Sequence, residues 1–590
     1  MKQQAGREFN GEGARGHMTR RIIIFIGAVL LALTAGAALP RPWLEPVFHQ
    51  GGYYFMWAAF SLWGLLLLRQ IYGRTGILLK RYYPVLLLCA GIMALIFHLS
   101  PPQFKILADE TNLIGVSMAM HYDKTVSVPV QGLALDYAGY DYQGGIDQRP
   151  LGYPFFVGLC HGLLGYSPGN GFVVNFLAGM MALFFLYLLL TRSFSGFYGL
   201  IGVLLTAACP VFAFWATSSG FETLHLFLVI FVFWSLDRFL TDRRVDLAEL
   251  LFLSLVLLAH CRYEAVIFIA GLVTLWPWLI NRDLIGRYRL PTLLCPFLML
   301  PLIWQRRLNF FSPAIFVGET RQTADSLFGF GHLTDHFSPN LFVLFGLDRD
   351  YGFIPTVFVL AVAGLYLVLR RWRRPAHGLS GHDRAIIRYG LACGIALFLF
   401  YASFFWGDFS LAIDNRLALV FLPFLVVPAV YAVKRWTSGA APFWRAALVF
   451  LAVMQIVHYW PVAEKQRLIQ GKSLTYEYNR VLGFLEANYD LSREKVLIIS
   501  DRANFYTIHG LGSVNFAYAN QQAEKLRQMK RIYYDHVLVL QRPHPRTGVL
   551  PPGQGLTADY RLRRLAEIPV GPDYEVRIST ADFSEAAVNQ

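Results

Sequence analysis

Two adjacent carboxylates stand out in the segment ILADETNLIG, residues 106–115, of a chain that is mostly apolar. Asp109 and Glu110 follow the end of an apolar run and precede a long loop. A carboxylate in such a position can act as a general base and remove a proton from a hydroxyl group. The pair could instead belong to a solvated loop, or could oppose the dipole of a nearby helix N-terminus. Taken alone, the pair leaves these interpretations open.

Further charged residues lie at the ends of other apolar runs. They are Glu222 in TSSGFETL, His260, Arg262 and Glu264 in LAHCRYEAV, and Arg416 in IDNRLAL. Each has a structural explanation: Glu222 could cap a helix, and Arg262 could pair with Glu264. Arg416 could pair with a neighbouring aspartate, and His260 could be a buried polar residue with satisfied hydrogen bonds. Charged side chains near membrane depth are costly, however, so their joint placement on the outer side favours a functional site.

Together these residue types suit one kind of reaction. Arginines can bind a phosphate in bidentate fashion and stabilise the charge that builds on it as it leaves. With a carboxylate base and an apolar groove for a lipid tail, they describe a membrane transferase that uses a lipid phosphate at the water–lipid boundary. One alternative is a transporter or flippase whose charges line a permeation path, which would show internal symmetry. Another is an assembly or sensor protein whose outer domain does the work on a membrane anchor.

The composition requires a membrane protein. The 590 residues are 55% hydrophobic and 15% charged, with a mean hydropathy of +0.44. Apolar runs of about 17–20 residues recur, and each can cross a hydrocarbon layer of roughly 30 Å. The net charge of +14 reflects Lys and Arg in short inner loops, so it does not indicate nucleic-acid binding. The six cysteines lie in or beside apolar runs without CxxC spacing, which indicates buried hydrophobes and not metal ligands.

We expect an all-α polytopic membrane domain with about 13 transmembrane helices. Basic loops such as DRFLTDRR and RRWRRP alternate with less basic ones, which places the N-terminus in the cytoplasm and the C-terminus outside a bacterial inner membrane. The first run could be a signal peptide, but an uncleaved anchor is favoured. The short apolar segment 150–165 is expected to lie at the interface, or to dip into the membrane and out again while covered by protein. The expected spans are 22–39, 53–68, 82–99, 171–190, 196–213, 222–237, 246–260, 265–280, 291–304, 353–370, 389–406, 417–433 and 443–459.

Three regions follow from this pattern. Residues 1–81 hold the cytoplasmic N-terminus and two additional helices, and residues 82–460 form a transmembrane catalytic domain. Its two long outer loops, 100–170 and 305–352, are candidates for function because long ordered loops are uncommon in compact proteins. Across 461–590 the apolar runs shorten to strand length, as in KVLIIS, HVLVL and YEVRI. Amphipathic helical patterns alternate with them, which predicts a small α/β domain outside the membrane.

The order and spacing of these motifs resemble the GT-C superfamily of polytopic glycosyltransferases, and within it the protein O-mannosyltransferases and the lipid A aminoarabinose transferases. The resemblance covers roughly residues 82–434. The chain departs from the family pattern in QRPLGYPFF, where Pro-Leu replaces a double proline, and in residues 1–70, which look like an addition. The matching positions are Asp109-Glu110, Arg149 with Pro150, Tyr153 and Pro154, Glu222, Arg262 with Glu264, and Arg416 with Pro423.

The resemblance implies that a sugar moves from a polyprenyl-phosphate carrier to a glycan, lipid or protein acceptor on the outer face, with inversion at the anomeric carbon. Asp109 would be the general base, and Glu110 and Glu222 would orient hydroxyl groups of the sugar or acceptor. No cofactor is expected. The nearer relatives work without a metal, whereas the oligosaccharyltransferase branch uses one, for which Asp109 and Glu222 could serve as ligands. Arg262 and Arg416, together with Arg149, would bind the lipid phosphate. The full set of candidate residues for binding substrate or lipid phosphate is Arg149, Tyr153, Glu222, His260, Arg262, Glu264 and Arg416.

Overall fold

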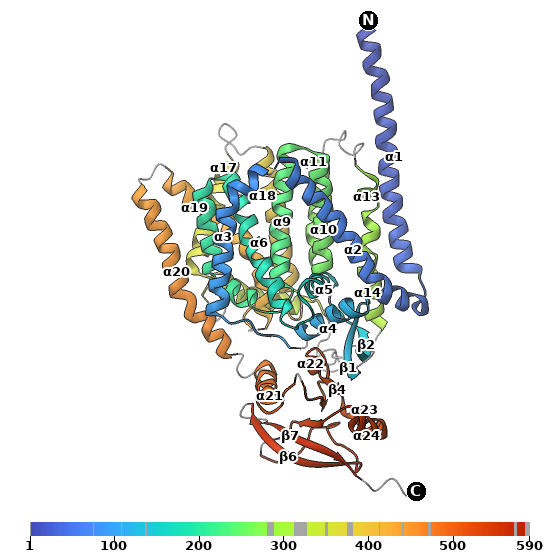
Figure 1. Ribbon diagram of the computed structural model, residues 1–590. Helices are drawn as coiled ribbons and strands as arrows, with labels where there is room; N and C mark the ends of the chain where they lie inside the picture. The colour runs from blue at the N-terminus through green and yellow to red at the C-terminus, as the bar shows by residue number, and fades with distance from the viewer. Residues whose placement is uncertain are drawn as a thin grey trace. The chain divides into compact units, whose positions relative to one another are not determined.

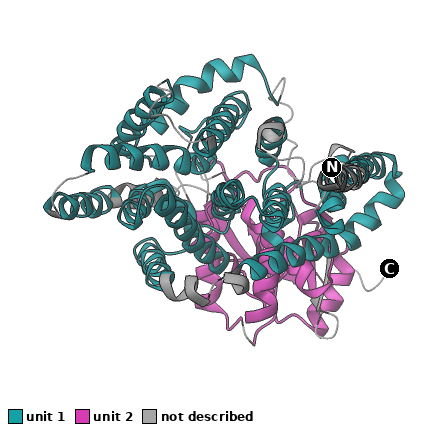
Figure 2. Ribbon diagram, turned by 90° about the horizontal axis from the view of Figure 1, so that it is seen from above, with its two compact units in different colours: residues 1–102, 148–155, 172–466 teal, residues 103–147, 156–171, 467–590 magenta. Residues whose placement is uncertain are grey.

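The computed structural model of the protein divides the chain into two compact units, which Figure 2 colours separately. Unit 1 comprises Met1–Pro102, Gln148–Phe155 and Phe172–Gln466. Unit 2 comprises Gln103–Asp147, Phe156–Gly171 and Arg467–Gln590. The structure describes residues 2–74, 76–107, 109–135, 139–279, 288–311, 327–347, 352–373, 381–411, 413–438, 442–469, 474–491, 493–544, 546–570 and 575–584.

Helices form most of unit 1. Apolar runs in a membrane become helical because every backbone N–H and C=O must then be bonded within the segment. Eight helices of the described residues are long and apolar enough to cross a membrane, or nine if the bent pair α7–α8 is one span, so this is an integral multi-pass membrane protein. The helices are α1 (Lys2–Ala38), α2 (Arg41–Arg74), α3 (Gly76–Leu99), α6 (Asn170–Ser193), α7 (Gly196–Ala208), α8 (Pro210–Ala216), α9 (Glu222–Asp242), α10 (Val245–Cys261), α11 (Ala265–Leu279), α13 (Leu290–Leu293), η1 (Cys295–Met299), α14 (Leu300–Phe311), α16 (Phe330–Leu344), α17 (Pro355–Trp372), α18 (Gly381–Ala402), η2 (Asp414–Phe421), α19 (Leu422–Thr437) and α20 (Pro442–Ile469).

The expected count of about 13 spans is not confirmed over the ranges that the structure describes. Proline explains two of the differences, because it removes an N–H and disfavours helical backbone at the preceding residue. Helices α7 and α8 are bent by 72° where Pro210 begins the second of them. The expected span 291–304 contains three prolines and is divided among α13, η1 and α14. Helix α5 (Gly152–Leu164) is a short apolar helix within the segment 150–165, whose expected place at the membrane interface stays a prediction.

Helix α9 lies at the centre of unit 1 and packs against α8, α10, α18 and η2 (Figure 1). It is the most enclosed of the helices long enough to cross a membrane, with 89% of its apolar window buried. Other helices of unit 1 also pack closely: a Cβ added at Gly364 of α17 would lie 1.8 Å from the carbonyl oxygen of Pro428 in α19. Such contacts at small residues let helix backbones approach one another. Glu222, the first residue of α9, is therefore surrounded by closely packed helices.

Unit 2 is built on a seven-stranded sheet with the strand order β2-β1-β4-β3-β5-β7-β6. Strand β3 pairs in parallel with β4 and β5, and the other pairs are antiparallel. The hairpin β1–β2 comes from the first long loop and joins the sheet through the pair Gly132–Ser513. The elements are α4 (Asp109–Tyr122), β1 (Ser127–Leu135), β2 (Gly139–Ile146), α21 (Leu474–Asn488), β3 (Val496–Ile499), α22 (Asn504–Thr507), β4 (Gly512–Val514), α23 (Phe516–Gln521), α24 (Ala523–Ile532), β5 (His536–Gln541), β6 (Tyr560–Pro569) and β7 (Glu575–Phe583), with α5 shared between the units.

The core of this sheet confirms the expected α/β fold. All side chains of β3 are buried, which is typical of a parallel strand covered on both faces. Leu133 of β1 belongs to the same hydrophobic core as Leu497 of β3 and Val539 of β5. The strand runs identified in the sequence are β3, β5 and β7, whereas β1, β2, β4 and β6 were not expected. The domain boundaries at residues 81 and 460 stay predictions.

Candidate functional site

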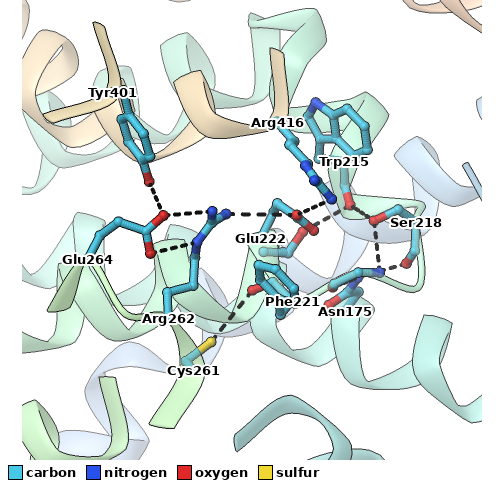
Figure 3. A network of polar contacts seen from close by, with 12 residues as sticks. Asn175, Trp215, Ser218, Phe221, Glu222, Cys261, Arg262, Glu264, Tyr401 and Arg416 are labelled. Carbon is cyan, nitrogen blue, oxygen red and sulfur yellow. Dashed lines mark hydrogen bonds and ion pairs between the residues drawn. The ribbon is translucent and has the colours of Figure 1, made fainter. Parts of the chain in front are cut away.

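A fixed turn places Glu222 at the start of α9. Asn175 of α6 donates from Nδ2 to the carbonyl oxygens of Ser218 (2.7 Å) and Gly220 (2.8 Å), so the turn is tied to a neighbouring helix (Figure 3). The N-cap is Phe221, so Glu222 is the first helical residue and not the cap that the sequence allowed. The carboxylate lies at the positive end of the helix dipole. Because its side chain is only 3% exposed, its charge also needs cationic partners.

Arg262 and Glu264 form a bidentate ion pair directly after α10 ends at Cys261. The Arg262 Nε lies 3.1 Å from Glu264 Oε2, and Nη2 lies 2.8 Å from Oε1. The guanidinium also covers the ring of Phe221 at 4.8 Å from its centroid, a favourable cation–π geometry. Tyr401 of α18 donates its hydroxyl to Glu264 Oε1 at 3.1 Å. The pair is thus buried and held from two further sides.

Glu222 joins this pair to a second arginine. Its Oε1 lies 3.8 Å from Arg262 Nη1 and 3.6 Å from Arg416 Nη1, and Figure 3 shows the carboxylate between the two guanidiniums. Arg416 comes from η2, which packs against α9. The charged network, defined here as Tyr401, Glu264, Arg262, Glu222 and Arg416, therefore contains two arginines and two carboxylates whose charges cancel. Such cancellation is what lets ions remain buried.

Access differs along the charged network. The side chain of Arg416 is 17% exposed, against 9% for Arg262 and 3% for Glu222. Arg262 donates two hydrogen bonds to Glu264, and it is the less exposed of the two arginines. An incoming anion would therefore meet Arg416 more readily than Arg262. The geometry suits a phosphate ligand at Arg416 and an orienting role for the groups behind it.

The other residues predicted for this site lie nearby but make different contacts. His260 Nε2 hydrogen-bonds to the carbonyl oxygen of Leu298 at 2.7 Å, in η1. The carbonyl oxygen of Arg149 accepts from Gln305 Nε2 at 2.7 Å. Tyr153 is fully buried near the start of α5. The start of α5 packs tightly on the end of α10, since a Cβ added at Gly152 would lie 2.6 Å from the carbonyl oxygen of His260.

The acid pair opens α4 in unit 2. Glu110 is only 2% exposed, so it is not part of a solvated loop. Its Oε2 accepts a hydrogen bond from the backbone N–H of Lys105 at 2.6 Å. Burial lowers the pKa of Lys105 to about 7, and the Glu110 carboxylate opposes this shift. Asp109 is partly buried in the same first turn, where a carboxylate is favoured by the helix dipole.

The sequence did not predict three residues that contact the candidate site residues or the turn before them: Asn175, Tyr401 and Lys105. Each is a single polar group within or beside an apolar stretch, a signal that also fits an ordinary core residue. The partners of Asn175 lie 43 and 45 positions away and that of Tyr401 lies 137 positions away. Lys105 lies only five positions before Glu110. In the part of the chain that the structure describes, no group of three or more His, Cys, Asp or Glu residues could hold a metal ion.

Comparison with known proteins supports the resemblance found in the sequence. Residues 148–304 match the family described as dolichyl-phosphate-mannose-protein mannosyltransferase. That segment contains Arg149, Tyr153, Glu222, His260, Arg262 and Glu264, but neither the acid pair nor Arg416. No curated protein sequence matches the chain.

Similar solved structures include a bacterial ArnT and an archaeal oligosaccharyltransferase. ArnT from Cupriavidus metallidurans in the apo state is 11% identical, with 85% of this chain and 98% of that chain covered and a TM-score of 0.48. The same protein bound to undecaprenyl phosphate is 13% identical, with coverages of 86% and 100% and a TM-score of 0.42. The Archaeoglobus fulgidus oligosaccharyltransferase, in complex with Zn and sulfate, is 12% identical, with coverages of 79% and 72% and a TM-score of 0.43. The family match supports the predicted resemblance over residues 148–304.

Proposed function

We propose that the protein is a glycosyltransferase that moves a sugar from a polyprenyl-phosphate carrier to a hydroxyl acceptor at the outer face of a bacterial inner membrane. The observation that carries this proposal is the charged network, in which a buried carboxylate and a bidentate ion pair orient a more accessible arginine. Most of the network lies in the segment that matches a family acting with dolichyl-phosphate-mannose, which is an isoprenoid lipid phosphate. A glycan, lipid or protein could supply the acceptor hydroxyl.

In this proposal Arg416 binds the lipid phosphate of the donor. As the sugar leaves, negative charge builds on that phosphate, and a fixed guanidinium stabilises it in a site with little water. Arg262 and Glu222 keep the Arg416 guanidinium in place. Arg149, Tyr153, His260 and Glu264 complete the donor site as contacts or as supports of those contacts.

Asp109 is the proposed general base. The acceptor oxygen attacks the anomeric carbon from the side opposite the phosphate, the bond between carbon and phosphate oxygen breaks, and the hydroxyl proton passes to Asp109. One displacement of this kind inverts the configuration at the anomeric carbon. Glu110 is proposed to orient hydroxyl groups while it holds the backbone of Lys105, which fixes the start of α4.

The topology belongs to the same proposal. The positions of the basic loops support a cytoplasmic N-terminus in this proposal. The C-terminal α/β region of 461–590 then lies outside, where a lipid-linked donor presents its sugar to extracytoplasmic acceptors.

The proposal is tested by sugar transfer in proteoliposomes from polyprenyl-phosphate donors that carry a labelled sugar. The parent chain is compared with Arg416→Ala and with Arg435→Ala, an exposed arginine of α19, as a matched control. We expect transfer by the parent and by R435A, and a loss of about 100-fold or more in R416A because a charged group that stabilises the leaving phosphate is missing. Equal transfer by R416A and the parent would refute the role of Arg416, and no transfer from any carrier would refute the function.

A further inference from the structure

The C-terminal part of the chain shares one sheet and one core with the segment that carries the acid pair. Leu133 of β1 packs in the core with Leu497 and Val539. The side chain of Gln131 accepts a hydrogen bond from the backbone N–H of Asn515 at 3.1 Å. This bond lies beside the pair Gly132–Ser513, through which β1 and β4 are joined. Strand β1 in turn contacts α4, the helix that begins with Asp109. The acid helix is therefore built into the same folded unit as the C-terminal region.

Two buried polar contacts link the C-terminal region directly to the acid pair. The first is a hydrogen bond from Asn504 Nδ2 to Asn112 Oδ1, 3.0 Å long, between residues that are 4% and 6% exposed. Asn112 follows Asp109 by three positions in α4, which places both on the same side of the helix. Asn504 opens α22, a short helix that packs against both α4 and β1. Moving α22 would therefore move the turn that carries Asp109.

The second link runs through Lys105 to Glu110. Thr475 of α21 donates its hydroxyl to the carbonyl oxygen of Lys105 at 3.2 Å. The backbone N–H of Lys105 donates to Glu110 Oε2 at 2.6 Å. Thr475, Lys105 and Glu110 are all nearly inaccessible, at 2–3% exposure. The backbone carbonyl and the backbone N–H of Lys105 thus connect α21 with Glu110, one of the two predicted catalytic carboxylates.

A buried ionic cluster of Glu477, Asp501 and Arg542 holds α21, the helix that carries Thr475. Glu477 of α21 accepts a hydrogen bond of 2.7 Å from Arg542 Nε, and Arg542 also pairs with Asp501. Burial would lower the pKa of Arg542, but Glu477 and Asp501 raise it above its ordinary value. Asp501 lies two residues after the end of β3, and Arg542 directly follows β5. The carboxyl ends of parallel strands form the edge of a sheet where ligands often bind. Here the carboxylate of Glu477 occupies that edge, so the cluster anchors α21 to the sheet.

We propose that the C-terminal region is a positioning element for the catalytic acids, with Asn504 and Thr475 as positioning residues. Asn504 sets the turn of α4 that carries Asp109, and Thr475 sets the Lys105 backbone that holds Glu110. This inference rests on the proposed function for the role of Asp109 as base. It predicts that the loss of either contact impairs the chemical step more than it impairs substrate binding.

Kinetics on the full chain in proteoliposomes test the inference. Asn504→Leu and Thr475→Val remove the two hydrogen bonds with little change in side-chain size. Their matched controls are Asn520→Leu, which removes bonds to Gly555 and Thr557, and Thr580→Val, which removes a bond to Arg563. We expect N504L to lower kcat by about 10- to 100-fold, because a displacement of about 1 Å can cost 100-fold.

We expect T475V to lower kcat by several fold, with KM for donor and acceptor within about twofold of the parent in both variants. The controls should keep parental kcat. A raised KM for the acceptor with unchanged kcat would overturn the proposal, since it would assign acceptor binding to this region. Parental kinetics in both N504L and T475V would overturn it as well.

Hydrogen exchange separates this inference from the proposed function. In the full chain reconstituted in lipid nanodiscs, N504L should speed amide exchange in α4 while exchange in β6 and β7 stays parental. N520L should leave exchange in α4 unchanged. Unchanged α4 exchange in N504L would refute the positioning role whatever the enzyme activity. Faster α4 exchange in N504L, together with a parent chain inactive on every polyprenyl-phosphate donor, would support the structural link and refute the proposed function instead.

Discussion

The ion pair between Arg262 and Glu264 permits a quantitative test of the charged network. Arg262 donates two hydrogen bonds to Glu264, at 3.1 Å and 2.8 Å, and the side chains are 9% and 10% exposed. Arg262→Met leaves the Glu264 carboxylate buried without its main countercharge. Breaking a buried pair in this way costs about 3–5 kcal/mol of unfolding free energy. In the double variant Arg262→Met/Glu264→Gln no charge of the pair remains, so about 1–3 kcal/mol of that loss should be recovered.

The assay is a double-mutant cycle, with unfolding followed by denaturant titration in one detergent. Arg244 and Asp246 at the other end of α10 provide a matched control, because they have the same sequence spacing and a similar two-bond geometry. The side chain of Arg244 is 36% exposed, so Arg244→Met should cost no more than about 1 kcal/mol. The reasoning would be refuted if the Arg262→Met and Glu264→Gln losses simply added in the double variant, or if R262M cost no more than R244M.

Two further predictions concern single side chains. Tyr401→Phe removes the hydroxyl that donates to Glu264 at 3.1 Å, and the same titration should show a loss of about 1.5–3 kcal/mol; a loss below about 0.5 kcal/mol would contradict the bond to a buried charge. Burial lowers the pKa of His509 from 6.5 to about 4, so the unfolded state binds more protons between these values. The unfolding free energy should therefore fall as the pH drops through this window, by at most about 3 kcal/mol from this residue. His509→Gln should make the fall shallower in pH-dependent thermal unfolding, and an unchanged slope would exclude the contribution of His509.

The sequence predicts the local features of this protein well. Runs of apolar residues identify most of the helices, and the short buried runs identify β3 and β5, because burial of a helix face or a strand is visible in neighbouring residues. Charged residues at the ends of apolar runs also identified Glu222, Arg262, Glu264 and Arg416, which the structure brings together. Their chemistry could be recognised because a buried charge requires a partner of opposite sign.

Features that depend on distant parts of the chain could not be predicted in this way. The bond between Asn504 and Asn112 joins residues 392 positions apart, and neither side chain has a distinctive sequence neighbourhood. The hairpin β1–β2 contains proline and glycine, so its pattern does not alternate as in an ordinary strand. Strand β6 was missed because five consecutive residues, Arg561 to Leu565, are exposed and mostly basic. The expected number of spans is not confirmed over the described residues, partly because prolines interrupt apolar runs that are otherwise long enough.

The central claim is that Asp109 removes the proton from the acceptor during sugar transfer. Asp109→Asn keeps the size of the side chain but cannot act as a base, and Asp123→Asn, at an exposed position beyond the other end of α4, is the matched control. Single-turnover transfer from a labelled polyprenyl-phosphate sugar should fall by about 100- to 10,000-fold in D109N. It should remain parental in D123N, with hydrogen exchange verifying that both variants fold. Parental transfer by a folded D109N variant would contradict the claim and would assign the base to another residue.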